Sequence, residues 1–444
     1  MTHTHANREQ SGAAGDAPLV KRAGRLDGLA RGEGTETGAS PGSRAKSRRL
    51  FWGVAFLYLV LLAGTNLPTP LYRGYEQAFH FSPLVVTLIF SAYVGALLPS
   101  LLLAGPLSDA IGRRRVLLPS VAAAVLGALC FALADGIAWL FAARAIQGVA
   151  VGVASGALSA ALIELEPDGN RARAAMVSAM ALFAGIGAGP LLSGALAQYS
   201  TDQRVIPYLV EIAVLLLASV AIASLPDPTT HSRWRPRRPQ VPPAIRGPFI
   251  TAGTLAFLAG TVTGLFLTLV PSYTLKLTGS TNLALAGGAV ALMFGASAAT
   301  QRVAYGRPEQ ILRLGGLALT LAGFVLLIVA GSAASLALLL AATLIAGVGQ
   351  GLAFLAAITG VNRVAPPERR ADVLSSFYVV TYLGTGVPVI GVGFLATATG
   401  LLTAVQYCAA VVAGVCLTAL AIYTVRQARA DRHPQVSTQT TAKR

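Results

Sequence analysis

The stretch that decides the fold is IAWLFAARAIQGVAVGVASGALSAALI, residues 137–163. Its only charged side chain is Arg144, and the run is longer than the roughly 20 residues that a helix needs to cross a bilayer. Backbone groups in lipid have no water to bind, so they must be hydrogen-bonded within their own segment. The stretch is therefore predicted to be a transmembrane helix.

Eleven other long apolar runs occur along the chain. They centre on residues 50–71, 83–106, 116–134, 174–198, 205–225, 248–272, 283–301, 310–330, 335–361, 373–397 and 400–425. Hydrophobic residues make up 54% of the chain and charged residues only 12%. The sequence therefore predicts an all-α, polytopic membrane protein with twelve transmembrane helices.

The basic residues are distributed very unevenly about these runs. Thirty of the 34 Lys and Arg residues lie at the two chain ends and in the gaps after the second, fourth, sixth, eighth and tenth runs. The other gaps hold only Arg73, Arg204 and Lys276. This asymmetry predicts a multi-pass protein of the cell membrane with both termini in the cytoplasm. We assign the net charge of +16 to topology and to contact with anionic membrane lipids, and we expect no nucleic-acid partner.

A Pro- and Arg-rich gap, residues 226–247, divides the runs into six and six. Prolines at this density prevent a regular helix, so we expect a cytoplasmic linker there. Two six-helix bundles are predicted on either side, at residues 50–225 and 248–427. The polar, basic ends at 1–49 and 428–444 are predicted to be disordered cytoplasmic tails.

The two halves share an internal repeat. Gln147-Gly148 is matched by Gln350-Gly351, 203 residues later, and Pro190 and Pro388 each lie among glycines in the following run. Repeated halves of the same orientation are typical of transporters that bind solute at the midplane, between the halves. The repeat therefore predicts two pseudo-symmetric bundles around one site.

The gap between the second and third runs reads GPLSDAIGRRR, residues 105–115. Its informative positions are Gly105, Leu107, Asp109, Gly112, Arg113 and Arg114. Glycines permit a tight turn, and an acid beside arginines can form an ion pair that opens and closes as the halves rock. The equivalent gap after the eighth run, QRVAYGRPEQ, keeps Arg and Gly but has no Asp, so we expect this joint to be asymmetric.

The loop motif resembles the loop signature of the major facilitator superfamily, although Ala110 stands where a basic residue is often found. The resemblance covers about residues 50–427. It implies the major facilitator fold, secondary active transport by alternating access, a monomer, and neither enzymatic activity nor a cofactor.

The helix predicted at 137–163 carries Arg144, Gln147, Gly148 and Gly152, which resemble a second signature of the superfamily, one associated with proton-coupled members. An arginine inside a span is costly in hydrocarbon, so Arg144 is expected to face the bundle interior. Gln147 lies three residues further along, on the same helix face.

The next helix contains GIGAGPLLSG, residues 185–194. Gly185, Gly189, Pro190 and Gly194 resemble the fifth-helix signature of superfamily members that export a solute in exchange for protons, and Ser193 departs from that pattern. Proline removes a backbone hydrogen bond, and glycines leave the bend unsupported. We expect this helix to act as a gate between the halves.

A proton-coupled transporter needs a titratable group in its interior. Glu211 is the only acid well inside a predicted span, so Glu211 and Arg144 are the coupling candidates. Polar or aromatic residues within the spans are the candidates for the substrate cavity: Asn66, Tyr93, Gln147, Gln350, Tyr378 and Tyr382. The helix is expected to unwind after Asn66, before Pro68 and Pro70. No metal site is expected, because the three cysteines all lie in apolar runs.

Together these features predict a proton-coupled exporter of a lipophilic, drug-like or secondary-metabolite solute. One alternative in the same class is an importer of a sugar, an organic acid or another small solute. A more remote alternative is a polytopic membrane enzyme, which would need clustered acids or histidines at a membrane face.

Overall fold

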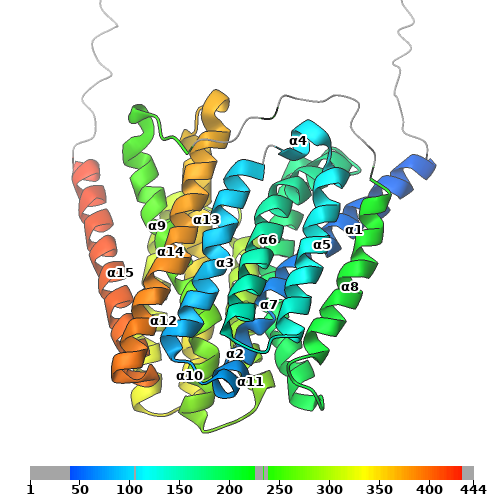
Figure 1. Ribbon diagram of the computed structural model, residues 1–444. Helices are drawn as coiled ribbons and strands as arrows, with labels where there is room; N and C mark the ends of the chain where they lie inside the picture. Colours follow the sequence, from blue (N-terminus) through cyan, green and yellow to red (C-terminus); the bar gives the residue numbers. More distant parts are fainter. Residues whose placement is uncertain (1–40, 105–106, 226–233, 235–238, 433–444) are drawn as a thin grey trace, which may run out of the picture. The chain divides into compact units, whose positions relative to one another are not determined.

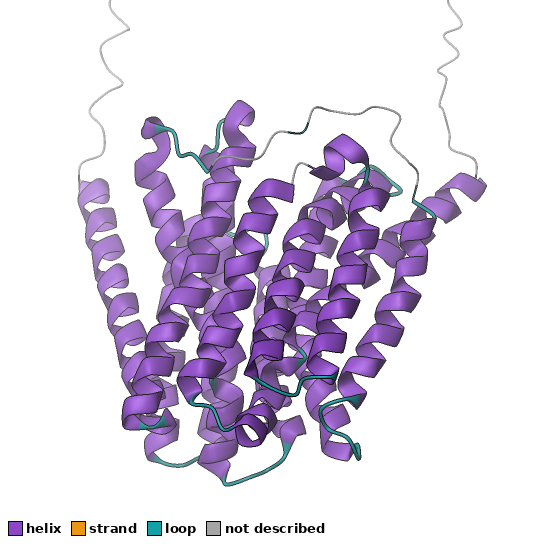
Figure 2. Cartoon of the chain, in the orientation of Figure 1, coloured by secondary structure: helices purple, strands orange, loops and turns teal. Residues whose placement is uncertain are grey.

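The computed structural model describes residues 41–104, 107–225, 234 and 239–432. Within these ranges the regular structure consists of helices and contains no strand (Figure 2). Twelve spans in this part of the chain are long and apolar enough to cross a membrane, which confirms the predicted number.

The first half contains six spans (Figure 1). Its helices are α1 (Pro41–Asn66), α2 (Pro68–Phe79), α3 (Pro83–Ala104), α4 (Leu107–Ile111), α5 (Arg113–Ala132), α6 (Ile137–Leu165), α7 (Arg171–Tyr199) and α8 (Ile206–Ala223). α1 and α2 form one bent span, because only Leu67 separates them and its backbone stays helical. The expected unwinding is therefore limited to a single residue.

The second half repeats this order. Its helices are η1 (Pro243–Ile245), α9 (Arg246–Thr268), α10 (Val270–Thr278), α11 (Leu283–Ala304), α12 (Glu309–Ser332), α13 (Leu336–Val364), η2 (Pro367–Arg369), α14 (Arg370–Thr399) and α15 (Leu401–Arg432). α9 and α10 again meet at one helical residue, Leu269, just before Pro271. The side chains of Asn282 and Ser335 cap α11 and α13 by accepting backbone N–H groups, which fixes where these helices begin.

Several helices extend beyond the predicted boundaries. α1 begins at Pro41 although the tail was expected to reach residue 49, and α15 continues to Arg432 although the bundle was expected to end at 427. Hydropathy marks only the part of a helix that lies in hydrocarbon, while polar residues can continue its hydrogen bonding beyond that part. Most of the predicted linker lies outside the described residues.

Equivalent helices pack in equivalent ways in the two halves. α6 packs on α3 and α5, and α13 packs on α11 and α12. Glycines allow these close approaches: a Cβ at Gly152 would lie 2.6 Å from the Leu97 carbonyl oxygen, and one at Gly351 would lie 2.7 Å from the Ser297 carbonyl oxygen. The predicted pair of pseudo-symmetric six-helix bundles is confirmed.

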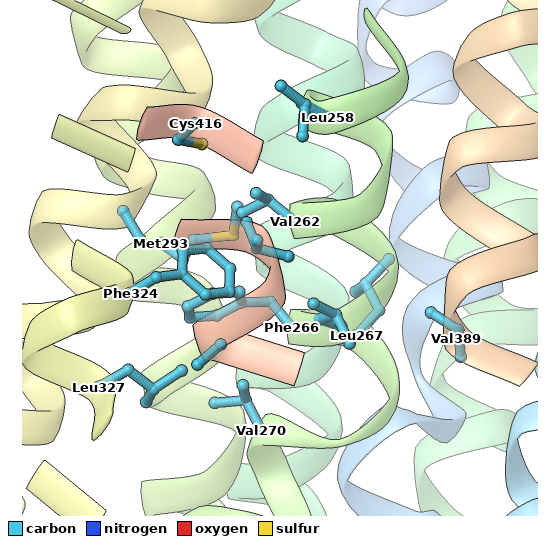
Figure 3. Packing of buried hydrophobic residues seen from close by; sticks show 14 of the residues in the cluster. Leu258, Val262, Phe266, Leu267, Val270, Met293, Phe324, Leu327, Val389 and Cys416 are labelled. Atoms are coloured by element: carbon cyan, nitrogen blue, oxygen red, sulfur yellow. The ribbon is translucent and has the colours of Figure 1, made fainter. Parts of the chain in front are cut away.

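The second half contains a large cluster of buried hydrophobic residues. Figure 3 shows Phe266 of α9 close to Met293 of α11 and Phe324 of α12, with Cys416 of α15 nearby. All four side chains are fully buried. Leu267, Leu327 and Val389 belong to the same cluster.

The halves contact each other through α3 with α14 and through α7 with α11. We call the end of the bundle that carries Arg113, Arg173 and Arg363 the Arg-rich end, and the other end the Arg-poor end. At the Arg-poor end the Leu84 N–H donates to Thr397 Oγ1 at 3.2 Å, and the Leu283 N–H donates to Gln198 Oε1 at 2.8 Å. These hydrogen bonds join the two halves at the Arg-poor end.

Candidate substrate and coupling site

Arg144 lies in the interior of the first half. Its side chain is only 1% exposed, so it faces the bundle interior as predicted. Nε donates to the Tyr72 hydroxyl at 2.6 Å. Nη1 donates to Gln147 Oε1 at 3.3 Å and also to the Thr65 carbonyl oxygen. Arg144 on α6 therefore holds α1 and α2 in place at the point where their span bends.

Four aromatic rings surround the Arg144 guanidinium. Its central carbon lies 5.5 Å from the ring centroid of Tyr72, 5.7 Å from Phe90, 5.6 Å from Tyr93 and 5.8 Å from Phe131. The ring faces attract the cation, which offsets part of the cost of burying it. One donor, Nη2, has no hydrogen-bond partner among the described residues. No local sequence pattern points to Tyr72, Phe90 or Phe131, because these residues come from three other helices.

Glu211 on α8 is also buried, at 6% exposure. It lies against Gly64 of α1, where a Cβ would collide with the carboxylate. Arg144 is close enough to act on its charge, yet no direct ion pair joins them within the described residues, and Glu211 Oε2 has no hydrogen-bond partner. The structure therefore brings the two predicted coupling residues into electrostatic range while leaving an oxygen of one and a nitrogen of the other unbonded.

Four tyrosines gather at the junction of the two halves, and we call them the tyrosine cluster: Tyr58, Tyr93, Tyr378 and Tyr382. Tyr58 comes from α1 and Tyr93 from α3, while the other two come from α14 in the second half. Tyr382 is within electrostatic reach of the other three. Tyr93 also borders Arg144, so the cluster is continuous with the buried arginine.

Two of the predicted cavity residues make their hydrogen bonds within their own half. Asn66 donates to the Leu62 carbonyl oxygen of its own helix at 2.8 Å. Gln350 accepts from the Ser297 hydroxyl at 2.5 Å and donates to Thr263 Oγ1 at 3.3 Å, which ties α13 to α11 and α9. Both side chains are occupied by bonds within their own half.

An apolar pocket lies apart from this site. It has a volume of about 590 Å³ and is lined by α9, α14 and α15, including Phe257, Val380 and Val411. None of its lining residues belongs to the tyrosine cluster or contacts Arg144. We therefore place the candidate site at Arg144 and the tyrosines, where charged and polar groups converge.

The predicted ion pair at the Arg-rich end is present. Asp109 on α4 lies 2.5 Å from Arg113, which also binds Glu164 at the end of α6 at 2.8 Å. Gly112 joins α4 to α5 with a φ of +100°, a conformation that glycine adopts without strain. Arg114 is exposed, and Gly105 lies outside the described residues.

The second half has its own ion-pair network, which the sequence reasoning missed. Glu309, the first residue of α12, lies 2.5 Å from Arg363 at the end of α13 and 3.7 Å from Arg313. The Arg313 guanidinium also lies 4.8 Å from the ring centroid of Tyr423. The stretch QRVAYGRPEQ has no Asp, but its Glu provides the acidic residue of this network. In this half the acidic residue, Glu309, lies at the start of α12, and its partner Arg363 lies near the end of α13.

The glycines of α7 serve two different contacts. A Cβ at Gly185 would lie 2.5 Å from the Leu59 carbonyl oxygen, and one at Gly189 would collide with Ala63, so both pack on α1 in their own half. Gly194 instead lies against Leu283 of α11, in the other half, and the Pro190 carbonyl lies against Gly287 there. The end of α7 with Pro190 and Gly194 therefore lies at the junction between the halves.

Comparisons with known proteins agree with this architecture. The family model described as Major Facilitator Superfamily matches residues 54–387. The chain is 35% identical over 161 residues to the 3-(3-hydroxy-phenyl)propionate transporter of Escherichia coli K12, which covers 35% of this chain and 38% of that protein. It is 28% identical over 191 residues to a putative multidrug resistance protein, MdtD, of Shigella boydii, covering 43% of this chain and 40% of that protein. Both alignments thus span about two fifths of the relative's length.

A solved structure supports the fold. A bacterial homolog of the human lysosomal transporter Spinster, in an inward-facing and unoccupied conformation, superposes with a TM-score of 0.70 at 14% identity, covering 90% of this chain and 100% of that one. The family match extends over most of the chain and includes both halves. This multi-pass membrane protein therefore belongs to the Major Facilitator Superfamily.

Proposed function

We propose that this transporter exports a lipophilic, drug-like or secondary-metabolite solute in exchange for protons, by alternating access. The observation that carries the proposal is the pair of buried charged residues, Arg144 and Glu211, beside the tyrosine cluster. Buried ionisable groups inside a span are costly, and they commonly mark a pathway for ions or substrate.

In the proposed coupling step Glu211 gains and loses the transported proton. When the carboxylate is charged, it attracts Arg144. When it is protonated, that attraction is removed, while the hydrogen bonds of Arg144 to Tyr72, Thr65 and Gln147 remain. Because Thr65 and Tyr72 flank the bend between α1 and α2, a change in the position of Arg144 acts directly on that bend.

The proposed solute binds at the tyrosine cluster. Tyrosines offer flat apolar faces together with hydroxyl groups, which suit an aromatic or lipophilic molecule with a few polar atoms. The cluster contains residues of both halves, so a solute bound there contacts both of the bodies that move against each other.

Export is supported by the resemblance of α7 to the exporter signature and by the Shigella relative, which is named a putative multidrug resistance protein. A second candidate is import of an organic acid, which is favoured by the Escherichia coli relative, named a transporter of 3-(3-hydroxy-phenyl)propionate. The positive-inside rule supports a cytoplasmic Arg-rich end in the cell membrane. In that orientation the hydrogen bonds between the halves lie on the outer side.

Reconstitution tests the proposal. Purified protein is placed in liposomes with an acidic lumen, and uptake of a panel of lipophilic cations, neutral drugs and aromatic acids is measured with and without a protonophore. An exporter accumulates a lipophilic compound against its gradient only while the proton gradient lasts. Accumulation that ignores the protonophore contradicts proton coupling. If only an aromatic acid is carried, and it accumulates when the lumen is made alkaline instead of acidic, the importer candidate replaces the exporter. Thiol labelling of Thr201→Cys in intact cells fixes the orientation.

A further inference from the structure

A second pocket, with polar residues in its lining, lies at the Arg-poor end between the two halves. It has a volume of about 390 Å³, within the range of small-molecule sites, and is lined by α2 and α3 of the first half and by α9, α10, α14 and α15 of the second. Its polar lining residues are Arg73, Glu76, Thr268, Ser272 and Lys276. None of them belongs to the tyrosine cluster or to the Arg144 site.

The pocket is lined by two basic side chains at the Arg-poor end, where basic residues are rare. The sequence gaps at the Arg-poor end hold three basic residues. Arg73 and Lys276 line this pocket, and Arg204 does not. Arg73 and Lys276 are 203 residues apart, the same separation as Gln147 and Gln350. They therefore occupy equivalent positions in the repeat, and each half contributes one cation.

These cations are not neutralised by the protein. Glu76 is within electrostatic reach of both, but no ion pair involving Arg73 or Lys276 is formed within the described residues. Arg73 Nη1 is buried and has no hydrogen-bond partner in the part of the chain that the structure describes. A buried donor without a partner is costly, so an acceptor supplied by a ligand would bind there favourably.

The remaining walls are apolar and include Pro83, Val86, Leu269 and Leu401. Two cations facing one carboxylate leave a formal charge of +1, which matches one monovalent anion. We propose that this pocket binds an amphipathic anion, with its carboxylate or phosphate oxygens between Arg73 and Lys276 and its apolar body against these walls.

Such an anion selects one conformation of the transporter. Arg73 belongs to the first half and Lys276 to the second, so an oxyanion between them attracts both halves at the Arg-poor end. When that end opens, the two cations separate and the site is lost. The anion is therefore expected to stabilise the arrangement described here and to slow the transport cycle. This site is additional to the transported solute's site and does not depend on the direction of transport.

Protection of an engineered thiol tests the proposal. A cysteine-free protein, with Cys130, Cys408 and Cys416 replaced by alanine, carries Ser272→Cys and is placed in phosphatidylcholine nanodiscs. The rate of labelling by N-ethylmaleimide, an uncharged reagent, is measured against benzoate, with benzamide as the uncharged isostere. Benzoate is expected to slow labelling, and benzamide is not.

Matched variants identify the groups that bind. Removing one charge-assisted contact, in Arg73→Gln or Lys276→Gln, is expected to raise the half-protecting benzoate concentration by about tenfold. Arg204→Gln, the basic residue at the same end but outside the pocket, should leave it unchanged. Glu76→Gln removes the repelling carboxylate and should lower it by about threefold. The opposite sign of this last change distinguishes loss of binding from loss of folding.

Equal protection by benzamide, or protection that survives both Arg73→Gln and Lys276→Gln, overturns the proposal. The source of the anion is resolved by repeating the experiment in nanodiscs that also contain phosphatidylglycerol. If a lipid headgroup fills the pocket, labelling is already slow in these nanodiscs without benzoate, and Arg73→Gln restores it. If the ligand is a soluble anion, the lipid has no effect on labelling and benzoate still protects.

Discussion

At position 144 the first half carries an arginine, and at the equivalent position of the second half, 203 residues later, stands Gly347. Arg144 binds α1 and α2 and is surrounded by aromatic rings, whereas Gly347 packs directly against the Met293 backbone of α11. One turn further on, both halves have a glutamine. Gln147 binds the arginine, and Gln350 binds two hydroxyl groups.

The two halves of the repeat therefore share their helix packing but differ in whether they bury charged side chains. Both charged side chains buried within spans, Arg144 and Glu211, belong to the first half. In the described part of the second half the charged residues lie near the ends of the spans, and its interior network joins only neutral groups. We infer that the first half carries the coupling chemistry and that the second provides a neutral partner for the solute site.

Loss of the arginine tests this comparison most severely. Arg144→Ala removes a cation near Glu211 and leaves the Tyr72 hydroxyl and the Thr65 carbonyl oxygen without their donor, so proton-driven transport should fall by about 100-fold or more. Arg144→Lys keeps the charge but not the planar guanidinium group, so its transport rate should be intermediate. The measurement is uptake into proteoliposomes, with size-exclusion chromatography to verify folding. Full activity in Arg144→Ala would remove this residue from the mechanism.

Neutralising the acid should separate coupling from transport. Glu211→Gln preserves the shape of the side chain but cannot exchange a proton, so downhill transport is expected to continue while the response to a pH gradient disappears. The readout is the ratio of uptake with and without the gradient, which should fall to about one from a wild-type value of about tenfold. A gradient response that persists in this variant would assign the proton to another group.

The two glutamines give a matched pair within the repeat. Gln147→Ala removes a bond to a charged group and should reduce transport by about tenfold. Gln350→Ala removes the acceptor of the buried Ser297 hydroxyl and a donor to the Thr263 hydroxyl, at a cost of about 1–3 kcal/mol, and should lower the thermal midpoint while transport changes by less than about threefold. Thermal scanning and uptake of both variants provide the comparison. Equal losses of transport would mean that the halves share the chemistry.

The smallest effects are expected at the Arg-rich end. Asp109 has a side chain that is 49% exposed, so its ion pair is worth only about 0–1 kcal/mol, and Asp109→Asn should slow cycling by about two- to threefold. Glu309 is only 14% exposed and contacts two arginines. Glu309→Gln should therefore lower the thermal midpoint more than Asp109→Asn does. The opposite ranking would show that the first-half network is the stronger of the two.

The sequence predicted the structure best where the cost of exposing a group to lipid decides its orientation. An arginine in an apolar run must face the protein interior, and Arg144 does. The reasoning was weaker where helices meet. Tyr72, Phe90 and Phe131 surround the guanidinium, but each lies on a different helix and has no local pattern that points to Arg144. Gln350 was expected in a cavity because it is polar, whereas its neighbours on α9 and α11 satisfy its hydrogen bonds.

The sequence by itself determined the number of spans, their division into two related halves and the inward direction of Arg144. It could do so because the cost of exposing backbone or charge to hydrocarbon applies to each segment separately. Only the tertiary structure decided that Glu211 lies within range of Arg144, that Tyr58 and Tyr93 meet Tyr378 and Tyr382, and that Arg73 and Lys276 share one pocket. Those contacts depend on how each helix is rotated and tilted against its neighbours, and the packing of side chains from distant segments sets that rotation.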